Sequence, residues 1–389
     1  TSLGQYGKIT VYNTVQADFN LMPTSCVYMW STNITFISQT TSYFPCLELN
    51  VSSSVDYQNQ SSTHSGTGNI EYMAGNNGTC VLEAGVNLYS DKELIFDNCT
   101  WVVYVGGDGQ ASSTWYAEKG IIIRTPIYLR PLSNNIIGSL KINADVSNTG
   151  LGAFTVTNQA FIQVESVGLS LVEIQASNIV VDSNAALWFN ASVVDTNFLL
   201  HLTTSNTPSA SILIGGDDLV SSGSSIATSS LLLTQQMLNT ISCAGILDIG
   251  GIYTDNIYMD DIVYPPNTIA TPSLIRIQAA QTLYSNLTIV NMPIIFNAPT
   301  LLAANDNVDI QANVTILAAL QLQSDLDCNG DGLLRVQNNS YVMTQSVSQP
   351  ILIQAAQLNL TFGYILAGLG MANLSFTNCM NQAIDVGGA

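Results

Sequence analysis

Acidic side chains stand side by side at two places in the chain, Asp217-Asp218 and Asp260-Asp261. Clustered carboxylates can act as the acid and the base of glycoside hydrolysis. Such sites usually also contain a positioned histidine or basic residue, and the two histidines of this chain lie near neither pair in sequence. No Gly-x-Ser-x-Gly elbow for a nucleophilic serine is present either. We therefore expect these carboxylates to cap turns, and we expect the chain not to be an enzyme.

A second group of oxygen-bearing side chains has the spacing of a calcium-binding loop. Asp327, Asn329 and Asp331 fall at loop positions 1, 3 and 5, where such loops supply oxygen ligands. The segment resembles the loop of dockerins and EF-hands, and the resemblance implies a structural calcium ion. It departs from that pattern because position 12 is Asn338, and neither flank has a helical pattern. The alternative is a plain Asn-Gly-Asp-Gly turn. We expect no other cofactor.

Charge is scarce and mostly negative. Charged residues make up 9% of the chain, with 8 basic against 27 acidic residues, whereas about a quarter of a typical soluble domain is charged. Nucleic-acid binding needs a basic surface, so we exclude nucleic acid as a partner. No uninterrupted apolar run is long enough for a membrane span.

Asparagine is abundant, with 36 copies, and many of them fall in Asn-x-Ser/Thr acceptor sequences for N-linked glycans. Glycans would solvate a surface that has few charges. The eleven predicted glycosylation sites are Asn33, Asn50, Asn59, Asn77, Asn98, Asn190, Asn286, Asn313, Asn338, Asn359 and Asn373.

The seven cysteines include two closely spaced pairs, Cys26 with Cys46 and Cys80 with Cys99. Their spacing predicts two local disulfides and an oxidising compartment, with buried free thiols as the alternative. The odd count leaves at least one cysteine unpaired or bonded to another chain. The chain starts without Met, which fits a mature product whose signal peptide has been removed. We therefore expect an extracellular or cell-surface protein.

Short aliphatic runs bounded by Asn, Ser, Asp and Gly predict an all-β fold. The triplet Ile-Gln-Ala begins at Ile174, Ile277, Ile310 and Ile353. In a strand its Ile and Ala point to one face and its amide to the other. Recurring about once per coil, the triplet would build the inner wall of a parallel β-solenoid, with amides stacked outside. The alternative is a set of β-sandwich domains that assemble by strand donation.

Two short patches resemble the repeats of a known class of surface proteins. Phe376-Thr-Asn-Cys, followed by Gly-Gly-Ala389, and Phe96-Asp-Asn-Cys99, followed by Gly106-Gly107, resemble repeats of polymorphic outer-membrane proteins. The Ile-x-Ala triplets are similar to the coils of filamentous-haemagglutinin-type adhesins. The resemblance implies a surface-exposed right-handed β-helix with an adhesive or structural role, and it assigns no catalytic residue.

The distribution of Trp, Cys and glycan acceptors predicts two regions. Residues 1–135 would form an N-terminal β region pinned by disulfides, and residues 136–389 a solenoid with Ile-x-Ala coils.

These patterns together predict a structural glycoprotein, a subunit of a self-assembling fibre or surface layer. Low charge removes repulsion between copies. The Gly-Gly-Ala389 end has no charged or Pro-rich cap, and the segment 4–12 has the pattern of a strand ready to pair. We therefore expect the partner to be a second copy, joined head to tail. The alternatives are an adhesin or carbohydrate-binding protein using Tyr253, Tyr258 and Tyr264, and, less favoured, a β-helix polysaccharide lyase or hydrolase.

Overall fold

The structure is a computed structural model of the whole chain. It describes residues 8–12, 27–37, 47–58, 70–82, 87–90, 93–105, 112–131, 138–157, 159–164, 169–189, 197–205, 210–216, 230–265, 270–337, 339–345, 349–361, 363–367 and 372–376.

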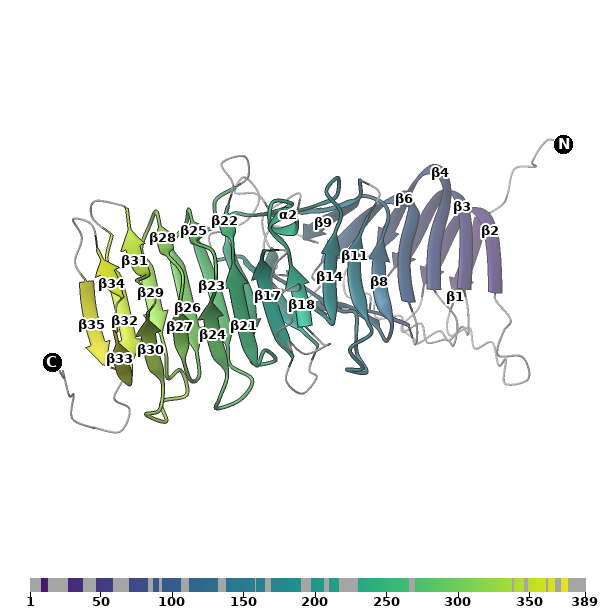
Figure 1. Cartoon of the computed structure of the whole chain (residues 1–389). Coiled ribbons are helices and arrows are strands. Elements are labelled where there is room, and N and C mark those ends of the chain that lie inside the picture. The colour runs from purple at the N-terminus through teal and green to yellow at the C-terminus, as the bar shows by residue number, and fades with distance from the viewer. Residues whose placement is uncertain are drawn as a thin grey trace. The chain divides into compact units, whose positions relative to one another are not determined.

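The described residues form a parallel β-solenoid, as the sequence predicts (Figure 1). Each strand register that the structure defines is parallel, and the one described helix is the four-residue α2 (Gln235–Leu238). Contacts divide the chain into two compact units, residues 1–201 with 240–245, and residues 202–239 with 246–389. The strand β16 (Leu199–Thr204) contains the division.

In the first unit, a long sheet runs from β1 through β6 to β19, and a second sheet joins β5, β7, β10 and β13. A typical coil passes through three strands, for example β10, β11 and β12. The strands of this unit are β1 (Lys8–Tyr12), β2 (Val27–Ile37), β3 (Leu47–Gln58), β4 (Ile70–Leu82), β5 (Asn87–Ser90), β6 (Glu93–Val105), β7 (Ser112–Ala117), β8 (Gly120–Ile123), β9 (Ile127–Pro131), β10 (Gly138–Asn143), β11 (Ala153–Val156), β12 (Phe161–Val164), β13 (Leu169–Ala176), β14 (Asn178–Val181), β15 (Ala186–Phe189) and β19 (Ile241–Cys243).

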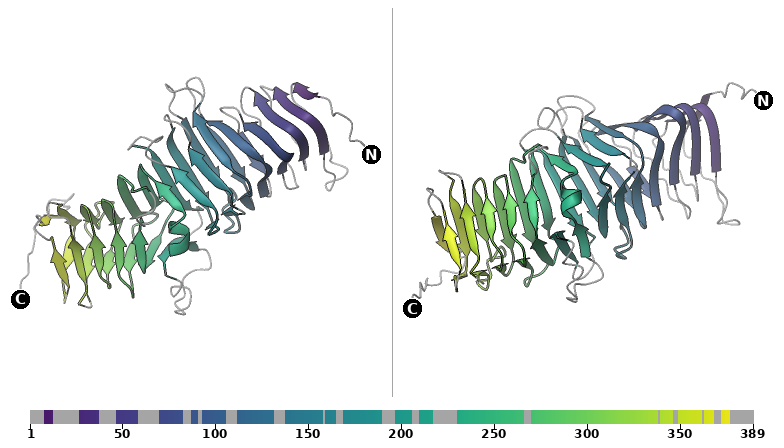
Figure 2. Two further views of the ribbon diagram at one scale, coloured as in Figure 1. Left: turned by 90° about the horizontal axis from the view of Figure 1, so that it is seen from above. Right: turned by 45° about the horizontal axis from the view of Figure 1, so that its top comes forward.

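In the second unit each full coil contributes one strand to each of three sheets, and successive coils lie side by side in the green and yellow parts of Figure 2. One sheet joins β20, β23, β26, β29, β32 and β35; another joins β18, β17, β21, β24, β27, β30 and β33; the third joins β22, β25, β28, β31 and β34. Their bounds are β17 (Ser211–Gly215), β18 (Ser230–Leu233), β20 (Ile246–Gly251), β21 (Asn256–Asp260), β22 (Ile262–Tyr264), β23 (Leu274–Ala279), β24 (Asn286–Ile289), β25 (Ile294–Phe296), β26 (Thr300–Ala304), β27 (Val308–Ile310), β28 (Val314–Ile316), β29 (Leu320–Gln323), β30 (Leu333–Val336), β31 (Tyr341–Thr344), β32 (Ile351–Ala355), β33 (Gln357–Asn359), β34 (Tyr364–Leu366) and β35 (Ala372–Phe376).

The inner wall follows the period-two pattern of the triplets. Ile277 and Ala279 are buried while Gln278 between them is half-buried, and the other three Ile-Gln-Ala triplets also bury their Ile and Ala. Ile277 stacks on Leu302 of the next coil, and Leu302 stacks on Leu322. Each such buried aliphatic side chain contributes about 1.5–3 kcal/mol relative to an exposed one. Coil-on-coil stacking therefore supplies the core.

The spacing of the triplets was expected to follow the coils, and it does not. Ile277 lies on β23, Ile310 on β27 and Ile353 on β32, and β27 belongs to a different sheet from β23 and β32. The triplets mark inner positions on more than one face, so the distance between them does not measure the length of a coil.

The core of the first unit contains an aromatic cluster. Phe96 lies 4.7 Å from Trp115 and 5.3 Å from Trp101 between ring centroids, and all three side chains are fully buried. The expected boundary near residue 135 falls between β9 and β10, which both belong to this unit.

Candidate functional site

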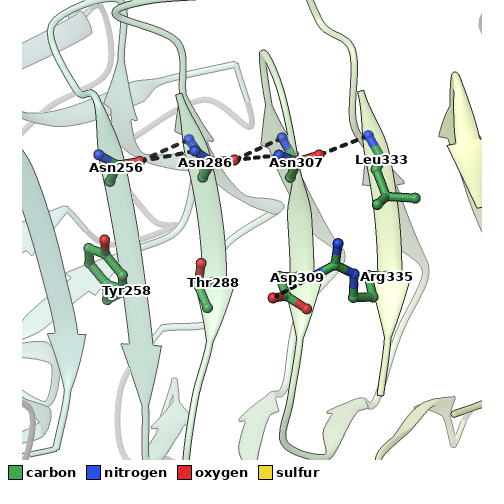
Figure 3. A pocket seen from close by; sticks show the side chains of 8 residues that line it. All are labelled: Asn256, Tyr258, Asn286, Thr288, Asn307, Asp309, Leu333 and Arg335. Carbon is green, nitrogen blue, oxygen red and sulfur yellow. Dashed lines mark hydrogen bonds and ion pairs between the residues drawn. The ribbon is translucent and has the colours of Figure 1, made fainter. Parts of the chain in front are cut away.

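An open polar groove of about 230 Å³ lies on the second unit, across β21, β24, β27 and β30 (Figure 3). Strand register brings one side chain from each coil into a row, because Tyr258 pairs with Thr288, Thr288 with Asp309, and Asp309 with Arg335. The eight lining residues are Asn256, Tyr258, Asn286, Thr288, Asn307, Asp309, Leu333 and Arg335.

One side of the groove is a ladder of asparagine side chains. Oδ1 of Asn256 accepts hydrogen bonds from the backbone N (3.2 Å) and Nδ2 (3.4 Å) of Asn286. Oδ1 of Asn286 in turn accepts from the backbone N (3.2 Å) and Nδ2 (2.9 Å) of Asn307. Oδ1 of Asn307 accepts from the backbone N of Leu333 at 3.2 Å. Each amide is therefore bonded to the coil that follows it.

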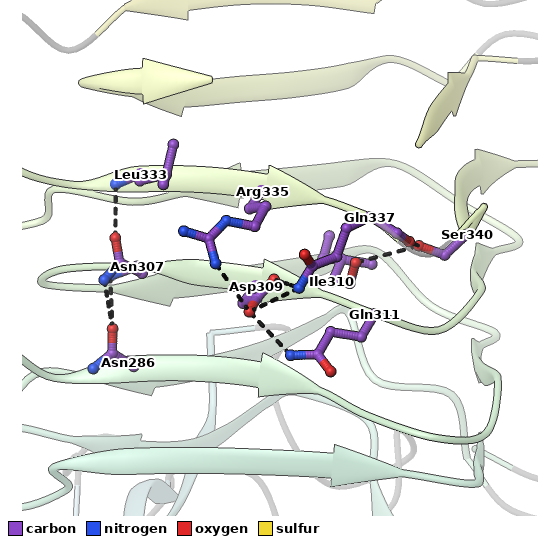
Figure 4. A network of polar contacts seen from close by, with 9 residues as sticks. All are labelled: Asn286, Asn307, Asp309, Ile310, Gln311, Leu333, Arg335, Gln337 and Ser340. Atoms are coloured by element: carbon purple, nitrogen blue, oxygen red, sulfur yellow. Dashed lines mark hydrogen bonds and ion pairs between the residues drawn. The ribbon is translucent and has the colours of Figure 1, made fainter. Parts of the chain in front are cut away.

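Asp309, the carboxylate among the described lining residues, also accepts hydrogen bonds from neighbouring side chains (Figure 4). Oδ1 of Asp309 accepts from Nε2 of Gln337 at 3.0 Å, and Oδ2 accepts from Nε2 of Gln311 at 3.0 Å. Nη1 of Arg335 lies 3.8 Å from Oδ2 of Asp309. Glycoside hydrolysis in its usual form needs two carboxylates across the substrate. Among the described residues that line the groove, Asp309 is the one carboxylate, and the other polar side chains offer amide, hydroxyl and guanidinium groups for hydrogen bonding.

The predicted calcium ligands lie together in the turn between β29 and β30, but the described contacts use their oxygens within the turn. Oδ2 of Asp327 accepts from Nδ2 of Asn329 at 3.1 Å, and Oδ1 of Asn329 accepts from the backbone N of Asp331 at 2.8 Å. Among the described residues, no three histidine, cysteine, aspartate or glutamate side chains are arranged so that they could hold a metal ion. Calcium at this turn stays a prediction.

Asp325, which the sequence pattern did not single out, is the most buried carboxylate of this turn, with 0% of the residue exposed. Its Oδ1 accepts from the backbone N of Gly330 at 3.0 Å, while its Oδ2 accepts no hydrogen bond from any residue that the structure describes. Burial raises the pKa of Asp325, and the nearby charge of Asp327 raises it further. Burial also raises the pKa of Asp306, with Asp331 and Asp327 as additional causes.

A similar turn in the first unit satisfies its carboxylate fully. Asp145 is buried, and its Oδ1 accepts from the backbone N (3.1 Å) and Oγ1 (3.0 Å) of Thr149. Its Oδ2 accepts from the backbone N of Gly150 at 2.9 Å. The two turns have the same backbone hydrogen bond. The backbone N of Asn148 donates to the carbonyl of Asp145, and the backbone N of Cys328 donates to the carbonyl of Asp325. Asp145 is therefore a natural control for Asp325.

Replacing Asp325 by Asn is expected to stabilise the second unit at neutral pH by about 1 kcal/mol, because it removes a buried charge with an unpaired oxygen. The pKa of Asp325 is raised in the folded state, so its stabilising effect is present in acid and is lost as pH rises through that folded pKa. Denaturant unfolding in acid and at neutral pH should show a weaker pH dependence for Asp325→Asn than for the original chain.

The control Asp145→Asn should instead destabilise by about 1 kcal/mol, because it weakens charge-assisted hydrogen bonds. If Asp325→Asn destabilises the chain as much as Asp145→Asn does, the unpaired oxygen of Asp325 does not lower stability. If calcium raises the stability of the original chain and Asp325→Asn removes that gain, the carboxylate is a calcium ligand.

Asp260 and His201 have structural partners, whereas Asp261 is exposed. Asp260 is buried and accepts from the backbone N of Met292 at 2.7 Å and from Nδ2 of Asn291 at 3.1 Å. Nδ1 of His201 lies 4.0 Å from Oε2 of Glu173. The pair Asp217-Asp218 lies outside the described residues.

The three tyrosines predicted to form a binding surface differ in burial. Tyr264 is buried, Tyr258 lines the groove and Tyr253 is half-buried. A row of aromatic rings occurs instead in the first unit, where Phe161 stacks on Trp188 at 5.0 Å and contacts Tyr128 edge-on at 5.3 Å. Irregular loop lengths separate these residues in sequence, so no local pattern indicated the row.

One cysteine is a free thiol, as the odd count allows. Cys243 is buried, and burial raises the pKa of its thiol to about 12, which disfavours the thiolate. Cys80 lies on β4 and Cys99 on β6, but the described side chains do not include them, and Cys26 and Cys46 lie outside the described residues. Their disulfides stay predictions.

The predicted glycosylation sites fall into three groups. Asn286, Asn313 and Asn359 have described side chains. Five others lie on strands with side chains outside the description, namely Asn33, Asn50, Asn77, Asn98 and Asn373. Asn59, Asn190 and Asn338 lie outside the described residues.

The fold and this surface define the chain as a parallel β-solenoid whose polar faces are hydrogen-bonded from coil to coil. Comparison with protein-family models, with curated proteins and with solved structures finds no match to it. Within the described residues, no helix has the length and hydropathy that crossing a membrane requires.

Proposed function

We propose that this chain is an extracellular structural glycoprotein, a subunit of a fibre or surface layer that assembles from copies of itself. The observation that supports this most is the use of polar side chains between coils. The groove's amides and its carboxylate bond to neighbouring coils, so they stiffen the solenoid and leave little free chemistry.

The same arrangement recurs outside the groove. Nδ2 of Asn143 donates to Oε1 of Gln175 in the first unit, and Nε2 of Gln321 donates to Oε1 of Gln354 in the second, both at 2.9 Å. Such amide ladders stabilise stacked parallel strands. The similarity of the Phe-x-x-Asn and Gly-Gly-Ala patches to surface β-helix proteins supports a surface role.

Association of copies would extend a contact that the fold already repeats. Each coil buries the apolar face of the next and continues its parallel ladder, as β23 does with β26. A second copy stacked in the same direction makes a heterologous contact, which propagates into a filament unless the rotation closes a ring. Each copy has a formal net charge of -19, so the apolar and backbone contacts between the ends of two copies must outweigh a mutual repulsion.

Sedimentation velocity of the purified chain at rising concentration tests this proposal. We expect species larger than the 41.6 kDa monomer, visible as filaments or sheets by electron microscopy. Because every copy carries a net negative charge, a higher salt concentration should screen the repulsion and favour association. A monomer at high concentration would overturn the structural proposal. A binding role for the groove, with hydroxyl-rich neutral glycans as ligands, would then take its place.

A further inference from the structure

The same glycan-acceptor sequence, Asn-Leu-Thr, occurs at Asn286 and at Asn359, on strands β24 and β33 of one sheet. The two copies do not occupy equivalent positions. Thr288 aligns with Asp309, Asp309 with Arg335, and Arg335 with Asn359. The second acceptor asparagine therefore stands in the row of Thr288, two residues away from the row of Asn286.

At the first copy the amide nitrogen of Asn286 donates two hydrogen bonds. Nδ2 donates to the carbonyl of Tyr284 at 2.6 Å and to Oδ1 of Asn256 at 3.4 Å. Oδ1 of the same side chain accepts two hydrogen bonds from Asn307. A sugar on Nδ2 would have to lie where Tyr284 and Asn256 now make contact, and it would break the ladder that lines the groove.

At the second copy the amide nitrogen is free to carry a substituent. Asn359 is exposed, and its Oδ1 accepts from the backbone N of Thr361 at 3.0 Å and from its Oγ1 at 2.5 Å. Within the described part of the chain, Nδ2 of Asn359 donates no hydrogen bond. This arrangement holds the amide oxygen and leaves the nitrogen open to solvent.

We infer that Asn359 carries an N-linked glycan in the folded protein and that Asn286 does not, an inference that rests on the proposed extracellular glycoprotein. In the reaction, Nδ2 of Asn359 forms a bond to the anomeric carbon of a lipid-pyrophosphate-linked oligosaccharide. The bond from that carbon to the pyrophosphate breaks, the lipid pyrophosphate leaves, and the amide gives up one proton. A chain modified at Asn286 before folding could not close its asparagine ladder, so it is removed from the secreted pool.

The test is glycopeptide mass spectrometry on the chain secreted from eukaryotic cells. Enzymatic deglycosylation in water enriched in oxygen-18 labels each asparagine that carried a glycan. We expect occupancy at Asn286 to be at least roughly tenfold lower than at Asn359. The matched variants Thr288→Val and Thr361→Val remove one acceptor sequence each and leave both asparagines in place. Thr361→Val should lose the mass of one glycan, and Thr288→Val should lose none.

The inference is overturned if Thr288→Val loses a glycan, or if Asn286 is occupied as fully as Asn359. It is overturned as well if Asn359 is bare while other acceptor sites are occupied, a result that leaves the glycoprotein proposal standing. If all eleven sites are bare, both fail.

Discussion

Replacing Gly215 by Ala is expected to lower the free energy of unfolding of the second unit by about 4 kcal/mol, which is large for a single substitution. Gly215 ends β17 with φ +95°, and it pairs with Asp260 of β21. A Cβ atom at this position would lie 1.7 Å from the carbonyl oxygen of Asp260 and 2.8 Å from Cγ1 of Ile262. The obstacle is backbone, so relief requires the two coils to separate.

Gly330→Ala is the control, because Gly330 has nearly the same backbone conformation, φ +91°, with no atom within 4 Å of the added Cβ. Its cost should be about 1 kcal/mol, that of a left-handed conformation alone. Thermal or denaturant unfolding of both variants measures the difference. Equal losses would show that the close approach of Asp260 contributes nothing.

Arg276→Met is expected to destabilise the second unit by about 3 kcal/mol, because it leaves a buried carboxylate without its partner. Nε and Nη2 of Arg276 donate to Oδ1 and Oδ2 of Asp248 at 2.9 and 2.7 Å, one coil apart, and Asp248 is 6% exposed. The hydrogen bond to Asp248 also raises the pKa of Arg276, so the guanidinium stays charged. Met keeps the aliphatic part of the side chain while removing the charge.

The matched control is Arg335→Met, which removes a looser pair at 3.8 Å whose arginine side chain is 41% exposed. Arg335→Met should lower the free energy of unfolding by less than about 1 kcal/mol. Denaturant unfolding of both variants, together with Arg276→Met/Asp248→Asn, completes the comparison. The double variant should recover part of the loss. If the two single variants lose the same amount, burial of Asp248 does not govern the effect.

The inner wall could be predicted from sequence because alternation along a strand is local. Ile277, Gln278 and Ala279 need no knowledge of the rest of the chain to place two side chains inward and one outward. Which strand lies above which could not be predicted, since loop lengths vary between coils. The starts of β23, β26, β29 and β32 lie 26, 20 and 31 residues apart (300 − 274, 320 − 300 and 351 − 320).

The same limit applies to the candidate site. The Asn-Gly-Asp-Gly pattern indicated the turn correctly, but the most buried carboxylate of the turn, Asp325, precedes that pattern. The backbone N of Asp325 bonds to the carbonyl of Asp306 in the preceding coil, a contact between coils that the local pattern does not contain. The groove likewise unites Tyr258 with Arg335, which are far apart in sequence and meet only through register. Tertiary contacts, which no local pattern encodes, selected these residues.

The asparagine ladder has a direction. From Asn256 to Asn307 the donors belong to the coil with the higher residue numbers and the acceptors to the coil before it, so the amide dipoles are aligned and reinforce one another. The positive end of this row is Nδ2 of Asn256, which donates to Oδ2 of Asp255 at 2.8 Å. A carboxylate thus stands at the positive end of the row, as an acidic residue does at the N-terminus of an α-helix. The row is an extended dipole built from side chains, and the carboxylate of Asp255 offsets the positive charge at the end where the row begins.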